Sequence, residues 1–378
     1  MNEPSCERHN KITACAVAAL CVLLAAGLIV MPKHNWSDNE NRQLASMPEF
    51  SAQTLAEGEY LAGVEDYLTD HFPLRDFFVS VNTRFNTLIG RREINGVFIC
   101  DDGFLIDKYS APARTDAILS ALNRLPQALG EYKVTLMLAP TAAAIYSEKL
   151  PLFAQQADQL ETMRQYYEGF DGRTVDVVQT LLEHKDEHQL YYRTDHHWTT
   201  YGAYYAYAEL CAQFGLEAIP QESFEFRRIA ENFKGTTYSK VNDFSAAGED
   251  MYMAILPGQN LFVEYGTGEN AVTGSLYNEE YLSQKDKYSF FLDNIHEQIT
   301  ILNPEAQTDR ELVIIKDSYA NCLVPFLAEH FARITIIDLR HYRDSVIDLI
   351  TADENITDVL VLYNLGTIDT DSGVTVIY

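Results

Sequence analysis

Two stretches of the chain, TDHHW and KDSYANC, carry the side chains best suited to chemistry. The first holds Asp195, His196, His197 and Trp198 in consecutive positions, and the second holds Ser318. A serine hydroxyl is a weak nucleophile that needs a base within hydrogen-bond reach, and a carboxylate holds that base in one tautomer. Asp195 and His197 are two residues apart, so in an extended segment their side chains point the same way. This spacing predicts a catalytic triad with Ser318 as nucleophile, His197 as base and Asp195 as the orienting carboxylate.

Two other interpretations of the TDHHW stretch stay open. Asp195, His196 and His197 are possible zinc ligands, but adjacent histidines seldom converge on one ion and no further His or Cys stands at ligand spacing nearby. Alternatively, both histidines and Trp198 are polar packing in the core. In the triad interpretation His196 points to the opposite face and supports the site. We expect no metal, and no cofactor because the chain has no nucleotide-binding glycine fingerprint.

Ser318 must be positioned by a turn between a strand and a helix. Leu312 to Lys316 predicts a buried strand, and Tyr319 onward predicts a helix. Ser318 then lies at the carboxyl edge of a sheet, where open α/β folds bind ligands. The N-terminus of the helix offers free N–H groups to a developing oxyanion. The plain alternative is a serine that only caps the helix.

The sheet that carries this edge is predicted from short apolar runs alternating with helical segments. The runs are KVTLMLAP, TVDVVQTLLEH, ELVIIKDS, RITIIDLR and DVLVLYNLG. Such alternation is typical of a parallel sheet covered on both faces, so the fold class is α/β. GVFICDDGFLIDKY predicts a hairpin, and Thr199 with Thr200 predicts the start of a helix. Between about residues 215 and 304 the alternation fails, which indicates an irregular insertion with short strands.

An apolar run near the N-terminus predicts a membrane segment. Ile12 to Met31 holds no charged residue and is long enough to cross a bilayer as a helix. No small-x-small cleavage site follows it, so we favour a retained signal-anchor over a cleaved signal peptide. The expected location is the bacterial cell membrane, single-pass, with the main domain extracytoplasmic. The expected parts are a cytoplasmic tail (1–11), a transmembrane signal-anchor (12–31), a stalk with packing helices (32–93) and a catalytic domain (94–378).

Charge and cysteines narrow the possible partners. A formal net charge of −27 makes nucleic acid a poor partner, because both surfaces are negative.

The cysteines fit neither a disulfide framework nor a zinc pattern. Half of them lie in or before the apolar run and the rest are widely spaced: Cys6, Cys15, Cys21, Cys100, Cys211 and Cys322.

The two stretches, TDHHW and KDSYANCLVPFLAEHF, together resemble the DHHW family of bacterial surface proteins, which belongs with the AlgX/AlgJ-type SGNH-hydrolase-like acetyltransferases. Further segments extend the resemblance over nearly all of the chain after the apolar run. WSDNENRQLASMPEF matches the family's Asn-Glu-Asn-Arg opening, and YLTDHFPLRD matches its Asp-x-Phe-Pro-x-Arg segment. GVFICDDGFLI is similar to its Gly-x-Asp-Gly hairpin, and LAPTAAAIYSEKLP to its strand-to-helix block.

This resemblance implies a three-layer SGNH-hydrolase-like domain and transfer of acetyl groups to an exported polysaccharide. It implies the same roles for Ser318, His197 and Asp195, and a membrane-bound O-acyltransferase as the acetyl-donating partner. One departure concerns the oxyanion hole: a Gly-Gly-Asn turn is expected after FFL, where this chain reads FFLDNIHEQ. Asn294 and Asn321 are the remaining amide donors, although Asn321 also fits a solvent-facing helix position.

Three functions are compatible with these residues. The leading one is O-acetyl transfer to a cell-surface or secreted polysaccharide through an acetyl-serine intermediate. A carbohydrate acetyl-esterase would use the same intermediate and release the acetyl group to water. A catalytically silent, membrane-anchored glycan-binding scaffold would need no triad, and the altered turn after FFL is its best support. His196 and Trp198 are further candidates for substrate contact.

Overall fold

The computed structural model describes residues 3–129 and 133–377. Met1 and Asn2, which belong to the predicted cytoplasmic tail, lie outside this part of the chain. The chain divides into two compact units. Unit 1 runs to Arg91 and includes Val241–Ser245, and unit 2 comprises Arg92–Lys240 and Ala246–Tyr378.

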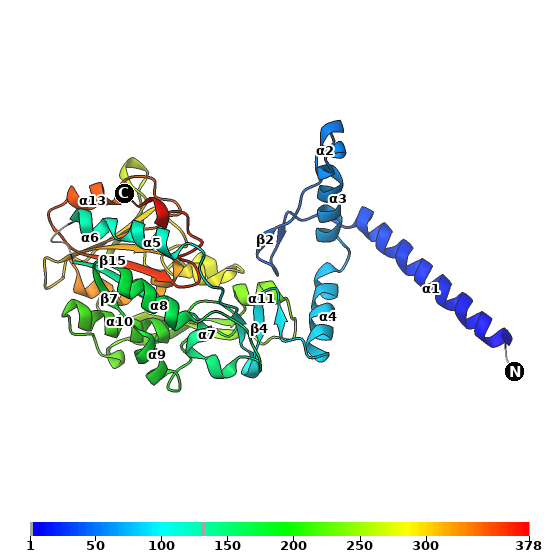
Figure 1. The fold of residues 1–378 in the computed structure, drawn as a ribbon, viewed down its shortest axis with the longest axis horizontal. Coiled ribbons are helices and arrows are strands. Elements are labelled where there is room, and N and C mark those ends of the chain that lie inside the picture. Colours follow the sequence, from blue (N-terminus) through cyan, green and yellow to red (C-terminus); the bar gives the residue numbers. More distant parts are fainter. Residues whose placement is uncertain (1–2, 130–132, 378) are drawn as a thin grey trace. The chain divides into compact units, whose positions relative to one another are not determined.

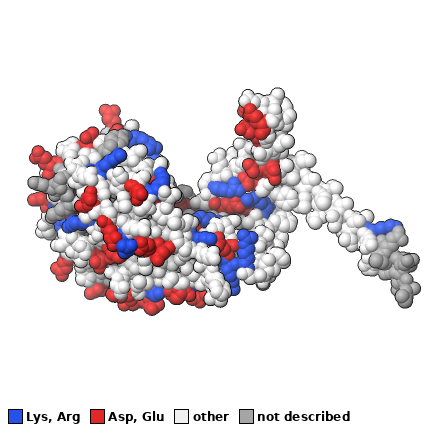
Figure 2. All heavy atoms as spheres, in the orientation of Figure 1, with Lys and Arg blue, Asp and Glu red and all other residues white. Residues whose placement is uncertain are grey.

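Unit 1 consists of helices and one short antiparallel strand pair. Its elements are α1 Glu3–Val30, β1 Trp36–Ser37, β2 Arg42–Gln43, α2 Ala52–Ala56, α3 Glu59–Asp70 and α4 Arg75–Leu88. Within α1, the stretch from His9 to Val30 is long and apolar enough to cross a membrane, a property that signal sequences share. Figure 2 shows most of this helix free of charged side chains.

Unit 2 is built on an eight-stranded sheet with the order β11-β10-β12-β14-β13-β15-β6-β7. Adjacent strands from β14 to β7 run parallel, and β12, β10 and β11 extend the sheet antiparallel. Of the smaller antiparallel sheets, one has β4 between β3 and β5, and another pairs β8 with β9. The strands are β3 Glu93–Ile94, β4 Val97–Ile99, β5 Leu105–Asp107, β6 Lys133–Ala139, β7 Arg173–Val175, β8 Glu225–Phe233, β9 Glu249–Ile255, β10 Phe262–Tyr265, β11 Val272–Gly274, β12 Gln298–Leu302, β13 Glu311–Lys316, β14 Arg333–Ile337 and β15 Ile356–Asn364.

Helices cover both faces of this sheet. Figure 1 shows α5, α6 and α13 on one side of β15 and α9 and α10 on the other, so unit 2 has three layers. The α-helices are α5 Thr115–Leu122, α6 Arg124–Leu129, α7 Ala142–Ile145, α8 Gln159–Gly169, α9 Val178–His184, α10 Thr200–Phe214, α11 Thr236–Val241, α12 Val324–Leu327 and α13 Val346–Thr351. The short 3-10 helices are η1 Asp101–Gly103, η2 Ser147–Lys149, η3 Gln221–Ser223, η4 Gly268–Asn270, η5 Glu279–Ser283, η6 Lys287–Phe290, η7 Ser318–Cys322, η8 Ala328–His330 and η9 Val374–Val376.

The mixed α/β class with a mainly parallel central sheet agrees with the sequence prediction, but two segments differ from it. TVDVVQTLLEH contributes only the end of β7 to the sheet, and its remaining residues form α9. The stretch 215–304, interpreted as an irregular insertion, supplies the three antiparallel strands of the central sheet. Short strands that pair with distant partners leave no alternation of strands and helices along the chain, so sequence patterns miss them.

The apolar runs of the parallel strands are buried, as expected for a sheet covered on both faces. In β13, Leu312 to Lys316 are all buried, and β15 is buried over most of its length. Their carboxyl ends lie at one edge of the sheet, where β13 leads to Ser318 and β15 ends at Asn364. Figure 2 shows Asp and Glu side chains at many places on the visible face of unit 2, in keeping with the acidic composition.

Candidate active site

The turn after β13 leaves the hydroxyl of Ser318 free for chemistry. The cap of the following helix is Asp317, whose side chain accepts the N–H of Tyr319 at 2.9 Å. Ser318 is the first residue of η7, which is a 3-10 helix and not the α-helix predicted from Tyr319. The first N–H groups of a helix have no partner within it, so the N–H of Ser318 can donate to an oxyanion. The capping interpretation of Ser318 is therefore replaced by a cap at the preceding residue.

Ser318, His197 and Asp195 lie in one hydrogen-bonded line. Nε2 of His197 is 2.7 Å from Oγ of Ser318, and Nδ1 of His197 is 2.6 Å from Oδ1 of Asp195. Because Nδ1 donates its hydrogen to the carboxylate, Nε2 is left as an acceptor for the serine hydroxyl. The side chains of Asp195 and His197 are almost fully buried, with 2% and 6% exposed. The arrangement is that of a serine activated by an oriented imidazole.

Both oxygens of the Asp195 carboxylate are held in place. Oδ2 accepts the backbone N–H of Thr236 at 2.8 Å and its hydroxyl at 3.0 Å, while Oδ1 also accepts the N–H of His197. A Cβ at Gly235 would lie 2.1 Å from Oδ2, so this close approach requires glycine. Burial would raise the pKa of Asp195, but the neighbouring imidazoles and these hydrogen bonds outweigh burial and lower it below its ordinary value. Asp195 is therefore ionised at neutral pH.

His196 lies beside His197 instead of on the opposite face, contrary to the prediction from extended geometry. The two imidazole centroids are 3.8 Å apart because the backbone bends here. Thr236 donates its hydroxyl to Asp195, so Oγ1 accepts from Nδ1 of His196 at 2.6 Å. Enclosure by protein atoms and the charge of His197 lower the pKa of His196 to about 4, although 27% of its side chain is exposed. His196 is thus neutral at neutral pH.

The same three residues, Asp195, His196 and His197, form the group that comes closest to a metal site in the described part of the chain. Their potential ligand atoms lie within 4.8 Å of one another. However, Nδ1 of His197 carries the proton that it donates to Asp195, and both carboxylate oxygens already accept hydrogen bonds. An ion would have to displace these hydrogen bonds and bind the freed nitrogen and oxygen atoms in their place. These three residues therefore fit a hydrogen-bonded catalytic site better than a zinc centre.

Hydrogen bonds of Trp198 and Tyr319 connect the TDHHW stretch to the KDSYANC stretch. Nε1 of Trp198 donates to the carbonyl oxygen of Tyr319 at 2.9 Å, and the Tyr319 hydroxyl donates to the carbonyl oxygen of His196. Trp198 is fully buried, so it cannot contact a substrate as the sequence suggested. Each segment therefore fixes the backbone of the other beside the Ser318–His197 hydrogen bond.

Tyr288 is a residue of this site that sequence reasoning missed. Its ring stacks on the imidazole of His197, with centroids 3.6 Å apart and planes 7° apart. Its hydroxyl lies 3.3 Å from the carbonyl oxygen of Ser318 and 3.2 Å from Sγ of Cys322. Tyr288 comes from η6, inside the stretch interpreted as an irregular insertion, and no motif marks it. The stack fixes the plane of the imidazole that must face the serine.

The two amide candidates for the oxyanion hole lie close to each other beside the turn. Asn321 is buried, which contradicts the solvent-facing alternative, and its Oδ1 accepts from the buried Nζ of Lys316 at 2.8 Å. Its Nδ2 is 3.5 Å from the carbonyl oxygen of Asn294, too far for a strong hydrogen bond. Since Lys316 holds the oxygen, the amide nitrogen of Asn321 remains available to another acceptor.

The turn after FFL keeps a left-handed backbone without glycine. Leu292, Asp293 and Asn294 have φ angles of 55°, 51° and 70°, in the region that glycine adopts most readily. A non-glycine residue there costs free energy and persists only where the surroundings fix it. The turn therefore has a backbone that glycine would favour, although the chain has no glycine there.

A cavity of about 630 Å³ lies next to the triad at the carboxyl edge of the sheet. Asp195, His196 and Tyr319 form part of its wall. Hydroxyl, amide and charged side chains contribute most of the remaining polar lining, including Thr141, Asn364, Thr367, Asp107 and Lys240. Most of the exposed lining is apolar, so the cavity combines apolar walls with a few polar groups, as ligand pockets usually do.

Comparisons with known proteins agree with this architecture. The family model described as DHHW protein matches residues 40–108 and 95–337. A DHHW family protein from Eubacterium siraeum DSM 15702 is 24% identical with a TM-score of 0.67, over 75% of this chain and 95% of that chain. Bacillus cereus PatB1, solved with a sulfonyl adduct, is 22% identical with a TM-score of 0.63, over 75% and 98%.

A more distant structural similarity involves the O-acetyltransferase domain of Pseudomonas putida AlgJ. It is 15% identical with a TM-score of 0.43, over 73% of this chain and 93% of that chain, which is too weak to carry an argument. Among the curated proteins, none matches this chain.

Proposed function

The chain belongs to the DHHW protein family, and from this membership and the site geometry we propose that it is an O-acetyltransferase acting on a cell-surface or secreted polysaccharide. The observation that carries the proposal is the contact of 2.7 Å between Nε2 of His197 and Oγ of Ser318, with Asp195 on the other ring nitrogen. The SGNH-hydrolase-like assignment of the domain is part of the same proposal, since a serine at the carboxyl edge of β13 suits it.

In the first half of the reaction, Oγ of Ser318 attacks the carbonyl carbon of an acetyl ester while Nε2 of His197 takes its proton. The ionised Asp195 stabilises the imidazolium that forms. The N–H of Ser318 and the amide of Asn321 are the proposed donors to the developing oxyanion. The donor alcohol leaves with the proton from His197, and an acetyl-serine remains.

In the second half, a sugar hydroxyl attacks the acetyl-serine, and His197 takes the hydroxyl proton and returns it to Ser318. The cavity that Asp195 and His196 help to line is the proposed place for this acceptor. Without an acceptor, water completes the same step and the protein acts as an acetyl-esterase. The chemistry needs no cofactor.

The proposal also includes the cellular location of the protein and the source of the acetyl group. With α1 retained as an anchor, the site works outside the bacterial cell membrane, where an acetyl ester must be supplied locally. A membrane-bound O-acyltransferase is the partner that the family resemblance predicts, and it stays a prediction.

The direct test uses the full chain in lipid nanodiscs with 4-nitrophenyl acetate and an aryl sulfonyl fluoride. We expect the wild type to hydrolyse the ester and to become labelled, and Ser318→Ala to lose both properties. Ser372→Ala removes an exposed hydroxyl and serves as the matched control, with unchanged turnover and labelling. Equal labelling of Ser318→Ala and the wild type would falsify the triad and favour the glycan-binding scaffold.

An added oligosaccharide separates transferase from esterase. A transferase attaches the acetyl group to the sugar, which mass spectrometry detects, whereas an esterase releases acetate at the same rate with or without sugar. Activity that survives a strong chelator excludes the zinc interpretation.

A further inference from the structure

Helix α4 in unit 1 exposes its apolar side. Phe77, Phe78, Val81, Phe85 and Leu88 are 42% to 79% exposed. At 100° per residue they fall within an arc of about 100° around the helix. An apolar stripe of this width on a water-soluble domain normally faces a core or a partner.

The buried side of α4 is the polar one. Thr83 donates its hydroxyl to the carbonyl oxygen of Val241 at 2.8 Å, and Oγ of Ser80 accepts the N–H of Phe244 at 2.9 Å. Both side chains are almost completely buried. The helix therefore cannot rotate its apolar stripe inward without breaking these hydrogen bonds within unit 1.

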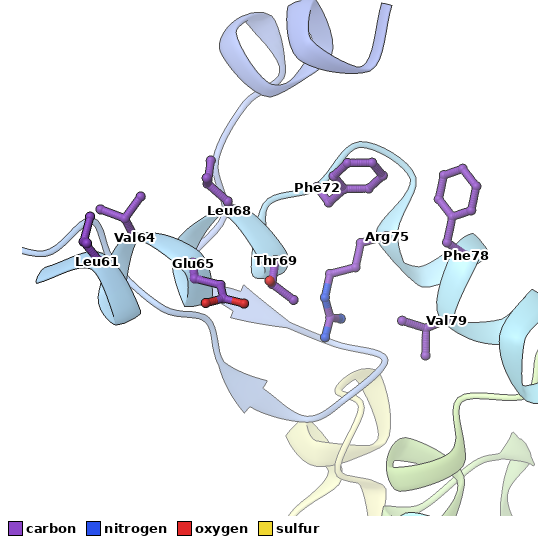
Figure 3. Close-up of a pocket in the computed structure, with 9 residues that line it drawn as sticks. All are labelled: Leu61, Val64, Glu65, Leu68, Thr69, Phe72, Arg75, Phe78 and Val79. Carbon is purple, nitrogen blue, oxygen red and sulfur yellow. The ribbon is translucent and has the colours of Figure 1, made fainter. Parts of the chain in front are cut away.

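Helix α3 adds a second apolar stripe, and an apolar pocket of about 520 Å³ lies between the helices. Figure 3 shows Leu61, Val64 and Leu68 on one side and Phe78 on the other, with Arg75 extending between them. Nε of Arg75 is buried and has no hydrogen-bond partner among the described residues. The terminal nitrogens of Arg75 already pair with Glu40 and Asp70. The pocket walls are mainly apolar and suit the hydrocarbon part of an acyl chain.

The corner between α3 and α4 is tied to the end of α1. A Cβ at Gly27 would lie 2.8 Å from Cγ of Pro73, so the proline packs directly on α1 about one turn before that helix ends at Val30. Nε2 of His71 is also 3.2 Å from the carbonyl oxygen of His34, just after α1. Next to Pro73, Leu74 is 63% exposed. If α1 crosses a bilayer, these contacts place the apolar corner at the membrane surface.

We infer that the exposed apolar side of α3 and α4 inserts into the membrane interface and that the pocket between them holds a phospholipid chain. The inference rests on α1 remaining in the membrane. Continuity from α1 through Pro73 to the stripe of α4 favours lipid over a second copy or a protein partner, because it requires only the bilayer that α1 already crosses. Aromatic side chains such as Phe77 and Phe78 suit the apolar edge of this interface.

The test measures lipid contact in the full chain. Cys6, Cys15 and Cys21 are replaced by alanine, and Cys100, Cys211 and Cys322 stay because they are buried. Phe77→Cys and Val81→Cys each carry an environment-sensitive fluorophore on the apolar stripe. Asn82→Cys is the matched control, since it is exposed on the same helix but lies about 140° around from Phe77.

In phosphatidylcholine nanodiscs we expect blue-shifted emission at both stripe positions and several-fold stronger quenching by doxyl-labelled phosphatidylcholine than at position 82. Equal, weak quenching at all three positions overturns the inference. A blue shift that doxyl lipids do not quench also overturns it and indicates a protein partner. All three substitutions replace exposed side chains, and circular dichroism checks that the variants are folded. The acetyl-transfer proposal plays no part in this measurement, so each can fail alone.

Discussion

Helices α10 and α4 place apolar and polar side chains in opposite ways. In α10 of unit 2, Ala203, Tyr207 and Leu210 are fully buried, as expected for a helix on the face of a sheet. In α4 of unit 1, the buried residues are Ser80 and Thr83, and the phenylalanines are exposed. The first arrangement is stable in water alone, whereas the second leaves apolar surface that a bilayer can cover.

This contrast indicates that the two units have different functions, catalysis in unit 2 and contact with lipid in unit 1. In unit 2, buried polar groups such as Asp195 have several hydrogen-bond partners each, which fixes atoms to the accuracy that chemistry requires. In unit 1, exposed apolar groups such as Phe85 have no such requirement, because a lipid surface accepts many orientations. Substitutions of buried groups in the site or core of unit 2 should therefore change turnover or stability, and substitutions on the stripe of α4 should change only the contact with lipid.

The largest effect is expected for Asp195→Asn. The amide cannot hold the charge and the tautomer of His197, and the loss of this function in a serine triad lowers kcat by about 10³ to 10⁴-fold. Ester hydrolysis by the full chain measures it. Lipid quenching of the label at position 77 should be unchanged in the same variant. A decrease of only a few-fold would mean that the carboxylate has a structural role and no part in the reaction.

A comparison of two phenylalanines tests the contrast in stability. Phe326 in α12 is fully buried among Tyr204, Tyr207 and Phe224, and Phe77 is 54% exposed. Phe326→Ala should lower the free energy of unfolding by about 3 to 5 kcal/mol. Phe77→Ala should change it by less than about 1 kcal/mol. Urea unfolding of the full chain in one detergent, followed by circular dichroism, gives both values. Equal losses would show that Phe77 is packed in a core.

The smallest effect concerns pH and compares the two histidines. Turnover should fall in acid, because a protonated imidazole at position 197 cannot accept the serine proton. The pKa of His196 is lowered to about 4, so that ring is neutral at weakly acidic and neutral pH. His196→Gln should leave the midpoint of the acidic limb unchanged, as a pH–rate profile measures. A flat wild-type profile, or a midpoint that moves in this variant, would contradict these assignments.

The sequence by itself determined the helices and strands whose formation depends on neighbouring residues. The apolar runs predicted a mainly parallel sheet, and the run from Ile12 to Met31 predicted a helix that can cross a membrane. Local spacing succeeds in these cases because hydrophobic periodicity and turn residues act over a few positions.

The tertiary structure alone decided which groups meet. It placed His196 beside His197, buried Asn321 against Lys316, and brought Tyr288 from an unpatterned segment onto the imidazole. It also turned the apolar side of α4 outward, because hydrogen bonds to Val241–Ser245 fix the opposite face. Such contacts join residues far apart in the chain, and their free energy depends on packing and desolvation that no single segment encodes.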